Sequence, residues 1–224
     1  MNSQEMEARI LELEKQVGEL RDIEAIQRLQ KSYGYYIQHW MYEELVDLFA
    51  DSPDTVLNIA AGIYERKEGV RRYFSSFKTL CENPEFLHQI MQLSGIVDVA
   101  PDGKKAQGRW FGFGAVALPV GAGIKPIAVN GIYMAEYIKV DGTWRILKLT
   151  WNPLYMVSPF ESWVKKERIE AISPSKTRIA TNPDKPRDIV TNYPSGYIVP
   201  FHFKHPVTGK KSSEAERNAK LKKK

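Results

Sequence analysis

The chain has 224 residues, of which 43% are hydrophobic and 26% are charged, a composition that suits a globular protein with a sizeable core. It contains no apolar run near the roughly 18 residues of a membrane span. Its single cysteine, Cys81, excludes an internal disulfide framework and a multi-cysteine metal site. The net charge of +5 is concentrated at the end, because residues 201–224 hold seven Lys and one Arg against two Glu. We therefore expect no membrane or nucleic-acid partner, and the charged first residues, unlike a signal peptide, favour the cytoplasm.

Residues 5–30 are predicted to form a helix. Apolar side chains recur along it at alternating spacings of four and three, as in a coiled-coil seam: Met6, Ile10, Leu13, Val17 and Leu20. A helix with so short a seam is only marginally stable by itself. It therefore needs a partner, which is either another subunit or the body of the same chain. We expect a homo-oligomer, a dimer or a trimer. Asp22 either caps a second helix that runs to about Trp40 or lies inside one continuous helix.

The following segments alternate between helices and strands. Residues 42–49 and 66–80 show the apolar spacing of helices, and residues 55–64 between them are predicted to form one strand. Period-two alternation then predicts four long strands in hairpin order: 87–100, 105–119, 125–140 and 143–155. Helices followed by such a meander indicate an α+β fold, with one curved antiparallel sheet packed against three helices.

The periodicity is lost beyond Pro159. Residues 160–172 are predicted to form a short helix, and the proline-rich segment after it holds too many aromatic residues for a disordered tail. We expect an arm laid over its own or a neighbouring subunit. The predicted organisation is a helical extension over 1–21, a domain over 22–160, an arm over 161–210 and a basic flexible tail over 211–224.

Several stretches resemble the SnoaL-like branch of the NTF2-like superfamily. They are IEAIQRLQKSYGYYIQHWMYEELVDLFADSPD, GIYERKEGVRRYF, HQIMQLSGIVDVAPDGKKAQGRW, GIYMAEYIKVDGTWRILKL and YPSGYIVPFHFKHPVTGK, which span most of residues 22–209. The resemblance implies a cone-shaped barrel with a cavity between the concave face of the sheet and the helices. It also implies chemistry without a cofactor.

The resemblance extends to scytalone dehydratase and related enzymes, whose site residues can be carried over by position. The acidic residue that these enzymes carry on a helix corresponds to Gln38. One histidine of their acid–base pair corresponds to His88, and the second histidine corresponds to Trp110. A cluster of hydroxyl or amide groups falls near Gly131 and Tyr133. This chain therefore retains one histidine of that set and lacks the acid and the other histidine.

The predicted strand register also directs His88 into the cavity. If a type I turn with a Gly bulge joins the first two long strands, Ala100 pairs with Lys104. One face then combines a histidine, an amide and a hydroxyl with two glycines that leave space. Its members are His88, Ile90, Gln92 and Ser94, opposite Val116, Gly114, Gly112 and Trp110. His88 is thus a candidate general base or acid, or else a surface or core histidine.

The last hairpin supplies two more candidates. A turn at Asp141-Gly142 aligns Tyr133, Ala135 and Tyr137 with Thr150, Lys148 and Ile146. Tyr133 either donates a hydrogen bond to a substrate oxygen or packs in the core. Lys148 is a candidate base if burial lowers its pKa, and otherwise a solvated strand residue.

Other side chains are assigned to substrate binding. Tyr33, Tyr36 and Trp40 form one helix stripe, which is either core or pocket wall, and His39 beside Gln38 is a candidate second titrating group. Asn58 either adds a hydrogen bond in the cavity or occupies a strand edge. Arg109 is predicted on the opposite strand face, as an interface or ion-pair residue, and a register slip would bring it inside to bind an oxyanion.

We expect no metal, because His202 and His205 have no carboxylate nearby.

An aromatic-lined cavity with few charges suits a small, hydrophobic, aromatic substrate. We expect a cofactor-independent lyase. The resemblance includes bacterial lyases that remove formaldehyde from lignin-derived diarylpropane or phenylcoumaran units to give stilbenes. Two alternatives remain: a dehydratase or isomerase on a polyketide-like or steroid-like substrate, and a non-catalytic binder of hydrophobic ligands.

Overall fold

The computed structural model describes residues 2–78, 83, 85–120, 123–159, 181–188 and 197–221. These parts hold four helices and six strands. The predicted helix over 160–172 and the single cysteine lie outside the described residues. None of the helices in the described ranges is long and apolar enough to cross a membrane.

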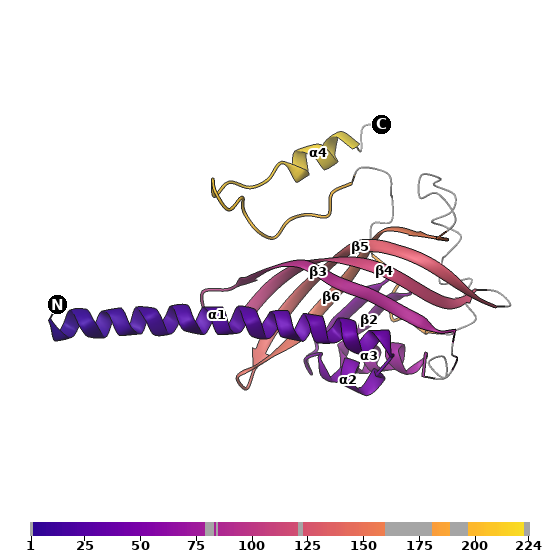
Figure 1. Ribbon diagram of the computed structural model, residues 1–224, viewed down its shortest axis with the longest axis horizontal. Coiled ribbons are helices and arrows are strands. Elements are labelled where there is room, and N and C mark those ends of the chain that lie inside the picture. Colours follow the sequence, from indigo (N-terminus) through magenta and orange to yellow (C-terminus); the bar gives the residue numbers. More distant parts are fainter. Residues whose placement is uncertain are drawn as a thin grey trace.

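Helix α1 (Ser3–Gln38) is one continuous helix, so Asp22 does not start a new one. The Asp22 carboxylate instead accepts hydrogen bonds from Lys139 Nζ at 2.7 Å and from Trp144 Nε1 at 2.8 Å, which ties α1 to the sheet. Beyond this point the inward stripe of α1 is buried: Ile26, Gln30, Tyr33 and Ile37. The first half of α1 projects away from the body of the molecule (Figure 1).

Two short helices and a hairpin follow α1. Helix α2 spans Tyr42–Asp47, and helix α3 spans Arg66–Ser75. The single strand predicted over 55–64 is wrong, because the chain reverses between β1 (Val56–Ile59) and β2 (Gly62–Glu65). Gly62 permits the reversal, since its φ of +141° lies in a region that side chains rarely adopt.

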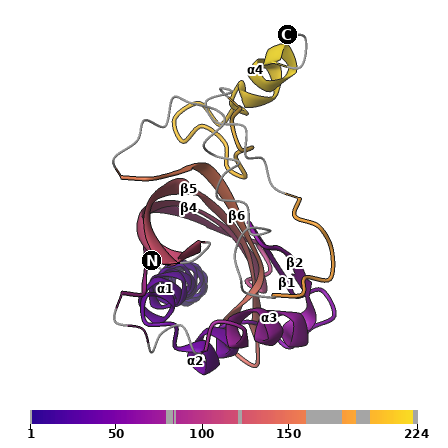
Figure 2. The ribbon, with the colours of Figure 1, turned by 90° about the vertical axis from the view of Figure 1, so that its right-hand side faces the viewer.

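The sheet has the strand order β2-β1-β6-β5-β4-β3, in which β1 and β6 are parallel and all other neighbours are antiparallel. The long strands agree with the predicted meander: β3 (Leu87–Val99), β4 (Lys105–Val120), β5 (Gly123–Val140) and β6 (Thr143–Val157). The sheet curves around α1, α2 and α3 (Figure 2). It does not close into the barrel that the resemblance implied, because β2 and β3 remain as separate edges.

The main core fills the space between the concave face of the sheet and the three helices. Large buried side chains from both layers meet there, among them Trp40, Phe74, Trp110 and Tyr137. Apolar residues outside this core are exposed on the outer face of β3 and β4, where Phe111 is 50% exposed. The fold is therefore α+β with a helix-covered concave face.

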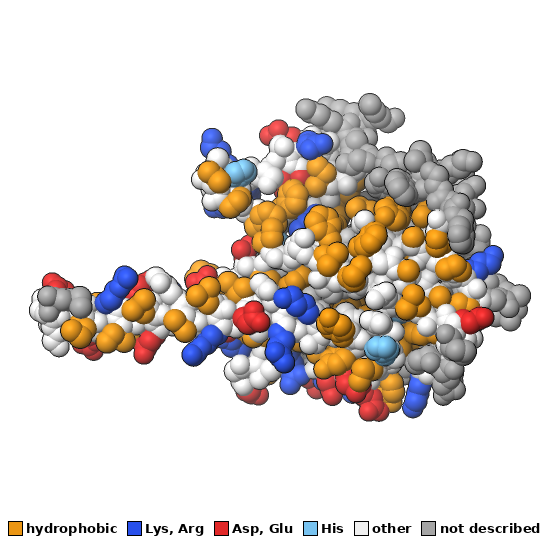
Figure 3. Space-filling model, in the orientation of Figure 1, with side chains coloured by type: hydrophobic (Ala, Val, Ile, Leu, Met, Phe, Trp, Pro, Cys, Tyr) orange, Lys and Arg blue, Asp and Glu red, His pale blue; other side chains and the backbone are white. Residues whose placement is uncertain are grey.

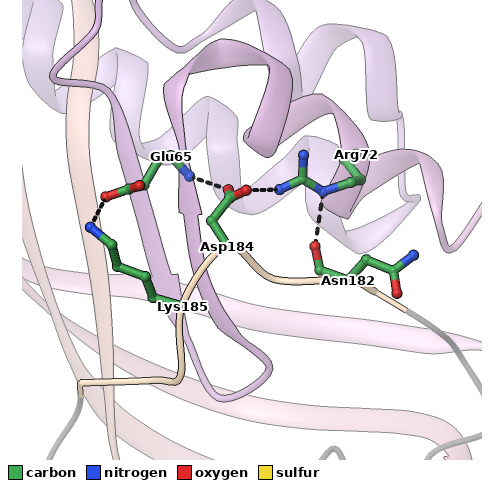
Figure 4. Close-up of polar contacts among 5 residues, drawn as sticks. All are labelled: Glu65, Arg72, Asn182, Asp184 and Lys185. Atoms are coloured by element: carbon green, nitrogen blue, oxygen red, sulfur yellow. Dashed lines mark hydrogen bonds and ion pairs between the residues drawn. The ribbon is translucent and has the colours of Figure 1, made fainter.

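The C-terminal region reaches the sheet at two places. Residues 181–188 extend the edge at β2, where Ile63 N–H donates to the Lys185 carbonyl, and Arg72 binds both Asp184 and the Asn182 carbonyl (Figure 4). Residues 197–221 lie on the outer side of the sheet and end in α4 (Glu214–Leu221) (Figure 1). This helix forms within the segment for which a flexible tail was predicted.

Candidate active site

The register between β3 and β4 directs His88 to the concave face. His88 pairs with Val116, and Gln92 pairs with Gly112, as predicted. The predicted pairing of Ala100 with Lys104 is wrong, because the Ala100 N–H donates to the Lys105 carbonyl. A bulge at Ser94 and Gly95 then shifts the pairing, so Ser94 does not pair with Trp110 and is exposed. The Trp110 indole lies over Gly95, where an added Cβ would stand 2.0 Å from a ring carbon.

A second bulge, between Glu136 and Tyr137, changes the predicted register of Tyr133 and Lys148. Tyr137 pairs with Ile146 as predicted, but the register shifts beside it, so Tyr133 pairs with Trp151. Lys148 instead pairs with Glu136, and its Nζ lies 3.0 Å from a carboxylate oxygen of that residue. Both side chains are partly exposed. The prediction that Lys148 shares a face with Tyr133 is wrong, because the bulge reverses every side chain beyond it.

His88 is a buried histidine in an aromatic environment. Its side chain is 9% exposed, and its ring stands 5.3 Å from the Trp40 ring in an edge-to-face arrangement. Burial lowers the pKa of His88 to about 4, so the imidazole is neutral at pH 7. Its Nδ1 is buried without a hydrogen-bond partner in the described part of the chain. A buried polar atom usually has a hydrogen-bond partner, so this nitrogen is unsatisfied among the described residues.

Tyr133 faces the same interior from β5. Its ring stands 4.4 Å from the Trp151 ring and 6.1 Å from the Tyr33 ring. The hydroxyl is hydrogen-bonded to the side chains of Gln92 and Tyr33. Burial raises the pKa of Tyr133 far above its usual range, so the hydroxyl keeps its proton and can act as a donor.

A chain of buried hydrogen bonds crosses the concave face. Trp110 Nε1 donates to the Tyr137 hydroxyl at 3.1 Å, and that hydroxyl donates to Gln30 Oε1 at 2.7 Å. Gln30 Nε2 then donates to Gln92 Oε1 at 2.9 Å. All of these groups are uncharged. Trp110 takes part in this series of hydrogen bonds as a donor. Gln30 is fully buried, yet its polar side chain on a helix gave no signal in the sequence.

The glycines on the concave face do not leave the space that the sequence suggested. A Cβ at Gly112 would meet the Trp151 ring at 2.3 Å, and one at Gly131 would meet the same ring at 2.6 Å. The indole and the neighbouring Tyr133 ring therefore cover this part of the sheet directly. The glycines accommodate large aromatic residues.

The end of α1 contributes less to the interior than expected. Gln38 is partly buried and lines an outer groove of about 360 Å³ between α1 and β3, together with Lys31, Tyr35 and Met91. His39 is exposed at the end of the helix, and Tyr36 is only partly buried. Tyr33 and Trp40 are the members of the predicted stripe that are buried in the core.

Two further candidates bind the C-terminal region instead of the interior. Asn58 Nδ2 donates to the Asp188 carbonyl at 2.8 Å. Arg109 lies on the outer face, and its Nη1 donates to the carbonyls of Val199 at 3.0 Å and Pro200 at 3.1 Å. Both side chains therefore hold the arm against the sheet. Within the described ranges, no group of three or more His, Cys, Asp or Glu side chains is placed to hold a metal ion.

A curved sheet with such a site on its concave face is typical of a known class of proteins that act on small molecules. Residues 18–150 match the SnoaL-like domain, so this chain belongs to the SnoaL-like family. That family lies within the NTF2-like superfamily, and its fold serves dehydratase, isomerase and lyase-type chemistry on small molecules.

Solved structures show the same fold. A candidate aromatic ring hydroxylase from Novosphingobium aromaticivorans is 22% identical, with a TM-score of 0.51 over 60% of this chain and 90% of its own. A candidate scytalone dehydratase from the same organism is 15% identical, with a TM-score of 0.53 over 66% of this chain and 94% of its own. LinA is 17% identical, with a TM-score of 0.51 over 66% of this chain and 96% of its own.

Proposed function

We propose that this protein is a cofactor-independent lyase for a small, hydrophobic, aromatic molecule, with His88 as the general base. The observation that carries the proposal is the unpaired, buried Nδ1 of a histidine that burial keeps neutral at pH 7. A neutral imidazole can accept a proton directly, and its aromatic neighbours suit an uncharged ring system. Tyr133 is the matching donor, because its hydroxyl stays protonated.

The finer proposal is the release of formaldehyde from a lignin-derived diarylpropane diol. Loss of the phenolic proton and of the benzylic hydroxyl as water would give a quinone methide. Loss of the proton from the hydroxymethyl oxygen would then break the adjacent carbon–carbon bond, and the electron pair would restore the phenolate of a stilbene. The products are one stilbene, one formaldehyde and one water. His88 would accept a proton and Tyr133 would support the departing oxygen. The resemblance to bacterial formaldehyde-releasing lyases supports this choice of substrate.

The test is the turnover of a diarylpropane diol by the purified full chain, with formaldehyde trapped and the stilbene followed by its absorbance. We expect His88→Gln to lower kcat by about 100-fold or more, since a positioned base contributes a factor of that order. His39→Gln is the matched control, because His39 is exposed at the end of α1, and it should retain full activity. A wild-type chain that releases no formaldehyde from such diols, or a His88→Gln variant as active as His39→Gln, would contradict the proposal.

The same site supports a second candidate, a dehydratase or isomerase on a polyketide-like or steroid-like substrate. The second candidate is favoured by a set of uncharged, hydrogen-bonded side chains that can orient a carbonyl or hydroxyl group: Gln30, Gln92, Tyr133 and Tyr137. Product analysis separates the candidates, since elimination or isomerisation releases no formaldehyde. Recovery of a bound ligand unchanged after long incubation would instead indicate a non-catalytic binding protein.

A further inference from the structure

The projecting half of α1 carries an apolar seam that its own chain leaves exposed. Hydrophobic side chains are visible along this part of the helix in the space-filling view (Figure 3). The seam consists of Met6, Ile10, Leu13, Val17 and Leu20, whose exposed fractions range from 44% to 66%. Exposed apolar side chains that share one stripe of a helix mark a contact surface.

The helix is well formed at its very beginning. Asn2 Oδ1 accepts a hydrogen bond from the Glu5 backbone N–H at 2.9 Å, and the Glu5 carboxylate accepts one from the Asn2 backbone N–H at 2.9 Å. This reciprocal capping box satisfies two backbone donors that a helix end leaves free. The seam is therefore presented on a continuous helix.

The seam faces away from the body of the protein. At about 100° per residue, its centre lies about 150° around the helix axis from the buried stripe at Ile26, Gln30, Tyr33 and Ile37. A second helix can therefore pack along the seam without meeting the sheet of the first chain. In a pair of such helices, the folded body of each chain would lie on the side of its own helix that faces away from the partner helix.

The residues of the seam and the charges beside it indicate the number of helices in the coiled coil and their relative direction. The four–three spacing assigns Ile10 and Val17 to heptad position a, and Met6, Leu13 and Leu20 to position d. Within parallel coiled coils, β-branched residues at a with Leu at d favour two strands over three or four, and the charges at e and g set the direction. In that alignment Arg9 at g lies opposite Glu14 at e of the other chain, so the flanking charges attract. The next a position is Glu24, which ends the apolar contact near Leu20.

We propose that α1 pairs with α1 of a second copy of this chain as a parallel two-stranded coiled coil over residues 6–20. The pairing covers all five seam residues and places two Arg9–Glu14 contacts across the interface. It leaves the concave face of each sheet free. The inference does not depend on the proposed reaction.

The first test measures the mass of the full chain in solution by light scattering and sedimentation at micromolar to millimolar concentrations. We expect twice the 25.7 kDa of one chain. Leu13→Glu places a charge in the seam and should weaken the dimer at least about tenfold. Leu11→Glu makes the same change on the same helix outside the seam and should leave the dimer intact. Because both positions are exposed in the single chain, neither variant should unfold the body, and circular dichroism checks this.

A charge exchange tests the flanking pair. Arg9→Glu or Glu14→Arg alone should weaken the dimer, and the double variant should restore it. Direction is tested with Met6→Cys in a Cys81→Ser background, which should oxidise to a covalent dimer because parallel strands bring the two copies of residue 6 together. A monomer at all concentrations, a trimer, equal effects of Leu13→Glu and Leu11→Glu, or a Met6→Cys dimer that forms no disulfide on oxidation would overturn the proposal.

Discussion

At the scale of single residues, the interior combines one titratable base with uncharged partners. His88 is neutral because burial penalises its protonated form, and its Nδ1 has no partner among the described residues. Tyr133 is held as a protonated donor by the same physical cause. The two groups therefore have opposite roles at pH 7, one able to accept a proton and the other able to donate a hydrogen bond.

The depressed pKa of His88 makes folding stability depend on pH. The folded value of about 4 lies below the usual 6.5, so the unfolded chain binds a proton first as the pH falls. Its stabilising contribution is fully present above pH 6.5 and is lost as the pH falls toward 4. We expect a loss of about 2 kcal/mol from this group between pH 7 and pH 5, measured by urea unfolding. His88→Gln should show a correspondingly shallower pH dependence. Parallel pH profiles for wild type and His88→Gln would contradict the assignment.

At the scale of elements, β4 and β5 are shaped by glycines that aromatic rings cover. Trp110 covers Gly95 at the bulge in β3, and Trp151 covers Gly112 of β4 and Gly131 of β5, where the pairing of β5 with β6 has another register shift. Any side chain at these glycines would push a large ring out of place. The curvature of the concave face and the position of Tyr133 therefore depend on residues that carry no chemistry themselves.

Gly112→Ala tests this packing. The new Cβ would stand 2.3 Å from the Trp151 ring, so we expect a loss of about 2–3 kcal/mol in the free energy of unfolding, as in other overpacked cores. Gly18→Ala on α1 is the control, because no atom lies within 4 Å of its Cβ. In an exposed helix that change should stabilise by up to about 1 kcal/mol. Denaturant unfolding of both variants gives the comparison, and equal stabilities would show that the rings can move aside.

At the scale of the whole molecule, the sheet lies between the helices on its concave side and residues 197–221 on its outer side, and residues 181–188 lie along its β2 edge (Figures 1 and 2). The arm is held at separate points by different contacts. Residues 181–188 are bound through Arg72, Asp184 and the edge of β2. Residues 197–221 are bound through Arg109 and through His202, whose Nε2 lies 3.4 Å from an Asp98 carboxylate oxygen, although no carboxylate was expected near His202. The Arg109 guanidinium also stacks 4.5 Å from the centre of the Phe201 ring. The two parts should therefore detach independently.

Arg109→Ala should release the second part alone. We expect faster hydrogen exchange and proteolysis over residues 197–221, with no change over 181–188, because the Arg72–Asp184 ion pair remains. Arg145→Ala removes another arginine–carbonyl contact, to Asp47 at the end of α2, and should leave both segments protected. Unchanged protection of 197–221 in Arg109→Ala would show that other contacts hold the arm.

The sequence by itself determined the local features of this protein. The capping residues at the start of α1, the glycine turns and the strand alternation depend on residues near one another in the chain. The pairing of His88 with Val116 was predicted from the wrong turn register, and it holds because the bulge at Ser94 and Gly95 offsets that error. The α+β fold could be predicted from them, and the family from stretches within residues 22–209, of which the family match covers residues up to 150.

Only the tertiary structure decided which polar residues face the interior. The bulge beside Tyr137 moved Lys148 to the outer face, and Gln30 became buried because Gln92 and Tyr137, distant in sequence, satisfy its amide. Bulges and buried amides are stable only when packing and hydrogen bonds from several strands and α1 agree. One inserted residue reverses the side chains that follow it, so an alternating pattern in one sequence could not specify the complete site.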